Sequence, residues 1–419
     1  MARAALKAVP AEEPEIESGL TEGGDASKFH DHLSIRHKSR QKPPRHLADM
    51  TREEREQTVV DLGLPKFRAH QLESHYFAHF SVDPEDLTDI PAVQRQSLAN
   101  RFFPKLITPL LTRTADNGTT IKTLWKLFDG ARIESVLMRY PMRTTLCISS
   151  QVGCGMGCPF CATGMLGLTR NLSAAEIVEQ VREAAKLVRD GGIVGGPARL
   201  SNIVFMGMGE PMANYRSVVS AIHEISALPP LGFGISARNI TVSTVGVVTG
   251  IKKLAKEDIP VRLAVSLHAP NDTLRDELVP MNKRFNLETV MDAAHDYFLA
   301  SKRRVSIEYA LMRGINDQAV HARQLARRIN AYGDDWAHVN PIPLNPVEGS
   351  KWTASKPEDE AQFIRILRSA GVTATLRDTR GNDIDGACGQ LAARYFAEHP
   401  EDEAQFGAFD SIKKAPENC

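Results

Sequence analysis

The sequence predicts an α/β fold: a partial, open βα barrel of about six βα units, preceded by a small N-terminal helical accessory domain. Two observations carry this prediction. From Arg143 onward, short runs rich in Val, Ile and Thr alternate with amphipathic stretches, several of which begin near Ser, Asn or Asp and end at Gly. This is the pattern of repeated βα units. Only about six units fit before residue 378, fewer than the eight of a closed barrel.

Length and composition describe an ordinary globular chain. Its 419 residues exceed the usual size of one domain, and 42% of them are hydrophobic, which allows a substantial core. Lys plus Arg and Asp plus Glu each number 51, so net charge gives no argument for binding nucleic acid. The sequence has no apolar run of membrane-spanning length and no signal-peptide pattern at its start. We therefore expect a cytoplasmic protein with no membrane segment.

The residues before the barrel fall into three parts. The first has few large apolar side chains, which predicts disorder, and the second has apolar residues at helical spacing. TTIKTLWKLFDGARIESVLMRY alternates polar and apolar residues around an Asp-Gly turn and predicts a β-hairpin. The predicted parts of the whole chain are a disordered arm (1–47), a helical accessory domain (48–105), a hairpin connection (106–142), the barrel (143–392) and the end of a C-terminal helix with a flexible tail (393–419).

Seven strands are predicted in the barrel region, with amphipathic stretches between them. The strands are short and β-branched, and the stretches between them are amphipathic at helical spacing. In parallel βα folds, reactive groups gather at the carboxyl ends of the strands, so these ends are where a site is expected. The predicted strands are TTLCISS, LSNIVFMG, NITVSTV, VRLAVSLH, VSIEYALM, AHVNPIP and VTATLRD, and the predicted helices include SAAEIVEQVREAAKLVRDG, NYRSVVSAIHEIS and KPEDEAQFIRILRSAG.

Three cysteines follow the first of these strands on a glycine-rich loop, GCGMGCPFCATG. Cys154, Cys158 and Cys161 have the spacing CxxxCxxC, and thiolates at such close spacing hold iron–sulfur clusters. A zinc site is the alternative, but zinc sites usually include a second Cys or Cys/His pair, and none follows nearby. We therefore expect a cluster held by three cysteines, which leaves one iron of a cubane open to a chelating molecule.

Other strand ends also carry polar residues. MGMGEPM follows the second strand and VSTVG ends the third, while SLHAP and NPIPLNP follow the fourth and sixth. Each feature alone is weak, because a Gly-Glu-Pro tripeptide can be a simple turn and a lone histidine is more often structural. Their common position at strand ends is the stronger signal. The candidate cofactor-binding residues are Gly209, Glu210, Ser243, Ser266, Leu267, His268 and Asn345.

Two further cysteines stand apart from the cluster motif. Cys147 ends the first barrel strand, and Cys388 lies in RGNDIDGACGQLAARY between two glycines at the opening of a C-terminal helix. A cysteine near a helix N-terminus can have a lowered pKa, and small neighbours give access to it. A buried apolar role is the alternative for either residue. As a pair, they are candidates for a reactive couple.

These motifs resemble those of a known superfamily. CxxxCxxC after the first strand of a partial barrel, followed by Gly-Glu-Pro after the second, resembles the radical S-adenosylmethionine (SAM) superfamily, so the expected barrel is of the radical SAM type. Within it, CISSQVGC, RNLSAAEIVEQV, FMGMGEP, SLHAP, IPLNP and GACGQL are similar to the RlmN and Cfr group of RNA adenine methyltransferases. The resemblance covers roughly residues 50 to 395.

The resemblance implies one 4Fe–4S cluster, held by three cysteines and an exchangeable SAM, with two SAM molecules used per turnover. One SAM methylates the Cys388 thiolate. A radical formed from the second removes hydrogen from that methyl group, and the resulting methylene radical adds to the base, leaving RNA bound to Cys388. Attack by Cys147 on the Cys388 sulfur then releases the RNA through a transient disulfide. Glu134, in ARIESVL, matches the proposed acceptor of the ring proton.

The resemblance also implies the substrates. The main branch of the group methylates C2 of adenine 2503 in 23S rRNA and C2 of adenine 37 in tRNAs, and its relatives methylate C8 of the rRNA adenine. C2 is favoured here because that branch is the widespread one. Such chemistry needs an unstacked base. The implied partners are 23S rRNA, tRNA and a flavodoxin-like or ferredoxin-like electron donor, and we expect a monomer.

Three alternatives stay open at this point. The first is a C8-methylating enzyme, which shares the same motif residues. The second is a radical SAM enzyme that does not methylate, such as an activator of glycyl-radical enzymes, although Cys388 in its glycine loop argues against it. The third is a zinc-stabilised RNA-binding protein without catalysis.

Overall fold

Six parallel strands form the centre of the molecule. The computed structural model describes residues 42–345, 347, 350–377, 380 and 389–399. Each parallel strand pairs with the next one along the chain, and the sheet is a linear row that does not close on itself. This confirms the predicted open barrel of about six βα units. The parallel strands are β4 (Arg143–Cys147), β7 (Asn202–Phe205), β8 (Ile240–Thr244), β9 (Arg262–Ser266), β10 (Val305–Leu311) and β11 (Ala337–Pro343).

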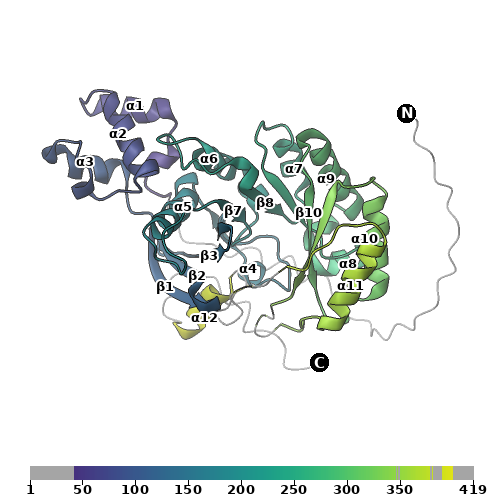
Figure 1. Ribbon diagram of the computed structural model, residues 1–419. Coiled ribbons are helices and arrows are strands. Elements are labelled where there is room, and N and C mark those ends of the chain that lie inside the picture. The colour runs from purple at the N-terminus through teal and green to yellow at the C-terminus, as the bar shows by residue number, and fades with distance from the viewer. Residues whose placement is uncertain (1–41, 346, 348–349, 378–379, 381–388, 400–419) are drawn as a thin grey trace, which may run out of the picture. The chain divides into compact units, whose positions relative to one another are not determined.

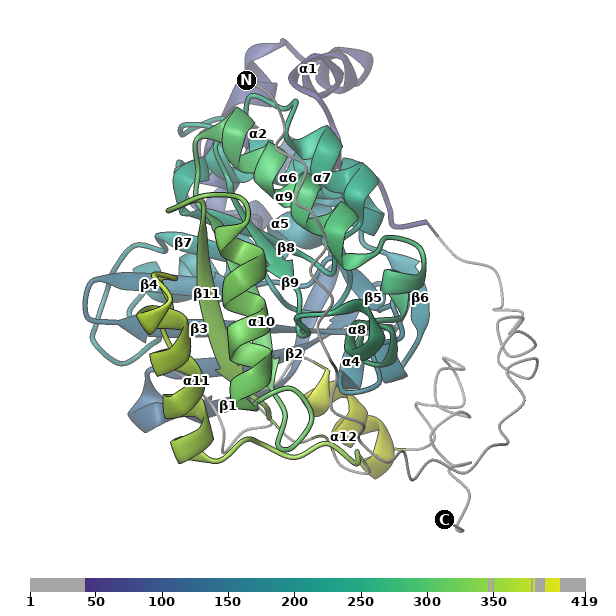
Figure 2. The same ribbon diagram turned by 90° about the vertical axis from the view of Figure 1, so that its right-hand side faces the viewer.

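One longer helix separates each parallel strand from the next, and a last helix follows β11 (Figures 1 and 2). Two of these helices begin as the sequence predicts: Ser173 and Glu176 form a capping box at one, and the Asn286 side chain caps another. Their buried faces are apolar, which fixes them against the sheet. The six helices are α5 (Ala174–Arg189), α6 (Tyr215–Ser226), α7 (Val248–Leu254), α9 (Leu287–Ser301), α10 (Ala319–Asn330) and α11 (Pro357–Ser369).

Three antiparallel strands extend the sheet beyond β4. The hairpin around Asp129 and Gly130 is present, formed by β2 (Thr120–Leu127) and β3 (Arg132–Tyr140). β3 pairs with β4, so the hairpin continues the main sheet. A further strand, β1 (Ile107–Ala115), lies at the edge beside β2. β1 was not expected from the sequence because Pro109 interrupts its pattern. Proline is tolerated in a strand at an edge or a bulge, and β1 has both. The register of β1 shifts between Pro109 and Leu111.

The seventh predicted strand, VTATLRD, is not a strand. Its residues run beside β11 and share only one bridge, between Val339 and Ala374. Three backbone hydrogen bonds hold the segment there, ending with Arg377 N–H donating to the Pro341 carbonyl. Its alternation of Val, Ala and Leu suits a strand, but a strand at the sheet edge needs more consecutive bridges to β11 than the described residues of this segment make.

Three helices form the N-terminal part of the described chain: α1 (Arg52–Asp61), α2 (Phe67–Glu73) and α3 (Ala92–Phe102). Residues of α1, of α2 and of the turn that follows α2 form a buried polar network with α5 and α6. Arg55 donates to Glu73 at 3.1 Å and to Glu224 on α6 at 2.6 Å, and Tyr76 donates to Glu179 on α5 at 2.6 Å. The helical part is therefore anchored to the barrel by charges that burial strengthens.

The packed region begins slightly earlier than predicted. His46 and Leu47, which fall inside the predicted arm, are fully buried. Burial lowers the His46 pKa to about 4, so its ring is neutral and accepts from the Ala48 N–H. Their burial was not predicted because the arm as a whole has few large apolar side chains. Residues 1–41 of the arm, and the tail from residue 400, lie outside the described residues.

The remaining regular elements are short. They connect or flank the barrel strands, and four of them take part in the site described below. They are β5 (Gln151–Gly153), β6 (Leu168–Asn171), α4 (Ala162–Met165), α8 (Asp272–Leu278) and α12 (Gln390–Glu398). No helix within the described ranges is long and apolar enough to span a membrane.

Replacing Arg55 tests the buried network. We expect Arg55→Ala to lower the free energy of unfolding by about 3–5 kcal/mol, because Glu73 would keep a buried charge without its partner. Arg52→Ala is the control, since Arg52 is exposed and pairs with Glu56 one turn away, and should cost under about 0.5 kcal/mol. Urea unfolding measures both variants. Equal midpoints for the two would contradict the account.

Candidate active site

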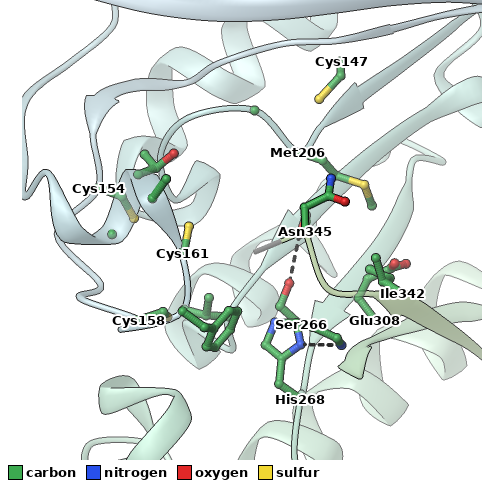
Figure 3. A pocket seen from close by; sticks show the side chains of 18 of the residues that line it. Cys147, Cys154, Cys158, Cys161, Met206, Ser266, His268, Glu308, Ile342 and Asn345 are labelled. Atoms are coloured by element: carbon green, nitrogen blue, oxygen red, sulfur yellow. Dashed lines mark hydrogen bonds between the residues drawn. The ribbon is translucent and has the colours of Figure 1, made fainter. Parts of the chain in front are cut away.

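The three clustered cysteines lie on the loop that follows β4 (Figure 3). The strands β5 and β6 pair across the base of this loop, and the Cys154 N–H donates to the Gly167 carbonyl at 2.7 Å. The far end turns into the short helix α4, where the Cys161 N–H donates to the Cys158 carbonyl. The loop is therefore pinned at both ends, and its three thiols line one cavity.

Burial makes two of these thiols poor acids by themselves. It raises the Cys154 pKa to about 12 and the Cys158 pKa well above the usual value. A bound metal reverses this balance, since its positive charge stabilises thiolates and releases their protons. Within the described ranges, no three His, Cys, Asp or Glu side chains are arranged around a single metal ion. A four-iron cluster does not require the three thiols to converge on one ion, because each thiolate binds a different iron. The all-sulfur donor set suits iron–sulfur chemistry.

Glu210 is held at the end of β7 by backbone donors. Its carboxylate accepts from the Met212 N–H at 3.0 Å and the Val245 N–H at 2.9 Å, and its own N–H donates to the Gln151 side chain. Gly209 has φ +103°, and a Cβ there would meet Gln151 at 2.5 Å, so only glycine fits. Full burial raises the Glu210 pKa to about 7 despite these bonds.

The ends of β8 and β9 meet beside the cluster loop. Ser243 and Ser266 place their hydroxyls 3.4 Å apart. His268 accepts the Ala310 N–H at Nδ1, and burial, with a smaller contribution from Arg275, lowers its pKa to about 3. The ring is therefore neutral with its proton on Nε2. Leu267 is buried and does not line the cavity.

β10 and β11 complete the cavity wall. Asn345 lines the cavity after β11. Glu308, which sequence reasoning missed, lies in the wall with its carboxylate almost fully buried. It accepts from Ser306 at 2.6 Å and Asn340 at 2.7 Å, and the Arg377 guanidinium is 3.8 Å away. A charged residue among the apolar positions of VSIEYALM was the available signal.

A cavity of about 340 Å³ joins these groups. Every predicted site residue within the described ranges lines it except Glu134 and Leu267. In Figure 3 the three cluster cysteines lie on one side of the cavity, and Cys147, Met206 and Asn345 lie on the other. The cavity lining includes Cys147, Cys154, Cys158, Cys161, Gly209, Glu210, Ser243, Ser266, His268, Glu308 and Asn345.

Cys147 is the last residue of β4 and is nearly buried. It pairs with Val136 on β3 and Val204 on β7, so its backbone is fixed from both sides. Its side chain reaches the same cavity as the cluster cysteines while belonging to the strand itself. The structure thus separates Cys147 from the loop motif, as the sequence spacing indicates.

Glu134 lies on β3 and contacts the start of α12. Its carboxylate is 2.9 Å from the Lys122 ammonium and accepts from the Gly389 N–H at 2.9 Å and the Ala392 N–H at 2.6 Å. Gly389 has φ +85°, and a Cβ there would meet the Thr163 backbone N at 2.7 Å. Gly389, which follows Cys388 in the sequence, is therefore packed against the cluster loop. Cys388 itself lies outside the described residues.

The chain is similar to known proteins along most of its length. Residues 148–326 match the Radical SAM superfamily. A probable dual-specificity RNA methyltransferase RlmN from Bifidobacterium adolescentis is 72% identical over 90% of this chain and 98% of its own length. The chain belongs to the RlmN family of radical SAM RNA methyltransferases. A Thermobifida fusca protein of the same name is 60% identical over 84% of this chain and 95% of its own length.

A solved structure extends the comparison to the fold. The crystal structure of a radical SAM methyltransferase from Sphaerobacter thermophilus superposes with a TM-score of 0.78 at 44% identity, and it covers 83% of this chain and 99% of its own. Membership of the RlmN family makes this chain a SAM-dependent RNA methyltransferase, and it implies a 4Fe–4S cluster and SAM as cofactors. This confirms the family that the motifs resemble.

The raised pKa of Glu210 predicts a pH-dependent stability of the metal-free protein. The folded value is about 7 against an ordinary value of 4.5, so the folded state holds this proton more tightly than the unfolded state. The contribution of Glu210 to the free energy of unfolding is therefore fully present below about pH 4.5 and is lost as the pH rises to about 7. Urea unfolding of wild-type and Glu210→Gln protein measures the difference. Parallel pH profiles for the two would contradict the raised pKa.

Proposed function

We propose that this RNA methyltransferase methylates C2 of adenine 2503 in 23S rRNA and C2 of adenine 37 in tRNAs. Support comes first from identity, since relatives that are 72% identical over almost their whole length carry the name of a dual-specificity RlmN enzyme. It comes also from the cavity, which combines three loop thiols with a fourth on a strand. That fourth thiol, Cys147, is the observation that carries the two-cysteine route, because cluster binding alone does not need it. The choice of C2 over C8 rests on the names of the relatives.

In this proposal Cys154, Cys158 and Cys161 hold the cluster. Gly209 and Glu210 bind the amino group of SAM, and Ser243, Ser266, His268 and Asn345 contact the rest of it from the cavity wall, while Leu267 contributes backbone only. When bound, the cluster and two SAM molecules per turnover supply the methyl group, an electron and the radical that removes hydrogen. The protein's own part is to orient these groups and exclude water.

In this proposal Cys388 and Cys147 both form covalent bonds during turnover. The Cys388 thiolate takes up the methyl group, and its sulfur later carries the methylene carbon bonded to C2 of the adenine. The radical formed when that carbon adds to C2 must lose one electron as well as the C2 proton, and the cluster, when bound, would take this electron. The Cys147 thiolate then attacks the Cys388 sulfur. The bond from that sulfur to the methylene carbon breaks, its electron pair goes to carbon, and carbon takes a proton to become methyl. The resulting disulfide needs two electrons before the next turnover.

Glu134 receives the C2 proton in this proposal. A carboxylate offers about four acceptor sites, and Lys122 with the N–H groups of Gly389 and Ala392 engages three of them. The same three donors fix the position of the carboxylate.

The partners in this proposal are 23S rRNA, tRNA and a flavodoxin-like or ferredoxin-like electron donor, with the enzyme acting as a cytoplasmic monomer. Both RNAs can present an adenine that is not held in a duplex, and single-stranded positions are where proteins reach base edges. Support comes from the words dual-specificity in the names of the relatives.

Mapping the product tests the proposed function. Reconstituted enzyme, SAM, a reductant and either an rRNA fragment or a tRNA should yield 2-methyladenosine, identified by mass spectrometry of nucleosides. A Cys158→Ala variant, in which the loop loses one thiol, is the control and should yield none. Formation of 8-methyladenosine would overturn the C2 assignment. A wild-type protein that binds zinc and RNA without modifying the RNA would overturn the enzyme function.

A further inference from the structure

The turn between β3 and β4 exposes an apolar side chain beside the cavity. Met142 is 94% exposed, between Pro141 and Arg143. Val194 is 54% exposed on a loop that reaches the neighbouring β1–β2 turn, where the Val194 N–H donates to the Gly118 carbonyl. A single exposed apolar residue is unremarkable in a soluble protein, so its surroundings decide whether it has a role.

A tyrosine next to Met142 carries two guanidinium groups. The guanidinium of Arg143 is 4.3 Å from the centre of the Tyr140 ring, and that of Arg380 is 4.4 Å away. Tyr140 and Arg143 are cross-strand partners, so the register of the sheet fixes their contact. Stacked guanidinium and aromatic planes are the surfaces on which single-stranded RNA bases stack.

The turn is also positively charged. Arg139 donates to the carbonyls of Gly195 and Gly196, contacts that leave its charge uncompensated. Among the described residues, no carboxylate forms an ion pair with Arg139 or with the exposed Arg143. Cations beside apolar and aromatic surface complement the phosphates and bases of RNA.

The turn continues directly into the cavity. Tyr140 and Arg380 both line it, together with Cys147 and the cluster cysteines. An adenine can reach the cavity only after it leaves its stack, and extruding a base leaves a gap between its neighbours. Proteins that open a stack often fill such a gap with an apolar side chain.

We propose that Tyr140, Met142 and Arg143 form the RNA entry element: Met142 takes the place of the extruded adenine, and the Tyr140–Arg143 stack binds the adjacent nucleotide. Arg139 neutralises the phosphate next to it. This inference rests on the proposed function insofar as the RNA must present an adenine for extrusion, and it applies equally to rRNA and tRNA because it reads stacking and charge, with no base-specific contact.

An RNA hairpin with 2-aminopurine in place of the target adenine tests the wedge. Wild-type enzyme should raise its fluorescence as the base leaves the stack, and Met142→Ser should roughly halve that rise. Leu228→Ser, at another exposed apolar position, is the matched control and should behave as wild type. Equal fluorescence for Met142→Ser and Leu228→Ser would overturn the proposal.

Steady-state kinetics on the unlabelled hairpin test the stack. Arg143→Ala should raise KM for RNA roughly tenfold with little change in kcat, and Arg365→Ala, an exposed arginine of α11, should match wild type. Reductive cleavage of SAM without RNA should be unchanged in every variant, which shows an intact cavity. Methylation by wild type with equal KM values for Arg143→Ala and Arg365→Ala would overturn this inference alone. Absence of methylation by wild type would overturn the proposed function instead.

Discussion

A buried ion pair between Lys122 and Glu134 ties the two ends of the fold together. Both side chains are almost completely buried, and the same carboxylate accepts two N–H groups from the first turn of α12. Removing one partner from such a pair leaves a buried charge, which costs about 3–5 kcal/mol. The segment that follows Cys388 is thus fixed to β3, and Gly389 lies against Thr163 of the cluster loop. The cavity depends on this junction.

Parallel strand order supplies the rest of the site. Because the carboxyl ends of β4, β7, β8 and β9 meet at one edge, residues far apart in sequence line a single cavity. Arg275 braces this edge, donating to the Val245 carbonyl at 2.6 Å and the Leu267 carbonyl at 3.1 Å. Burial there keeps His268 neutral and raises the Glu210 pKa. The same low-dielectric surroundings strengthen whatever polar contacts a bound cofactor makes.

The sequence predicts the barrel, the cysteines of the cavity and several polar groups at the strand ends, because all of these follow from local patterns. Alternation of strands and helices gives the strand ends, and the cysteine spacing marks the loop. Features that depend on tertiary contact were missed. β1 was not predicted because Pro109 interrupts its pattern, and the described residues of VTATLRD share one bridge with β11. Leu267 shares a motif with Ser266 and His268 but points into the core. Glu308 becomes visible only when Asn340 and Arg377 come close to it.

The central claim is that Cys147 resolves a covalent intermediate between RNA and Cys388. Turnover of the Cys147→Ala variant with SAM, reductant and RNA tests it most directly, with peptide mass spectrometry after nuclease digestion. The account predicts an adenosine adduct on the peptide that contains Cys388, because no thiol remains at the end of β4 to attack that sulfur. Free methylated RNA with an unmodified Cys388 peptide would contradict the two-cysteine mechanism.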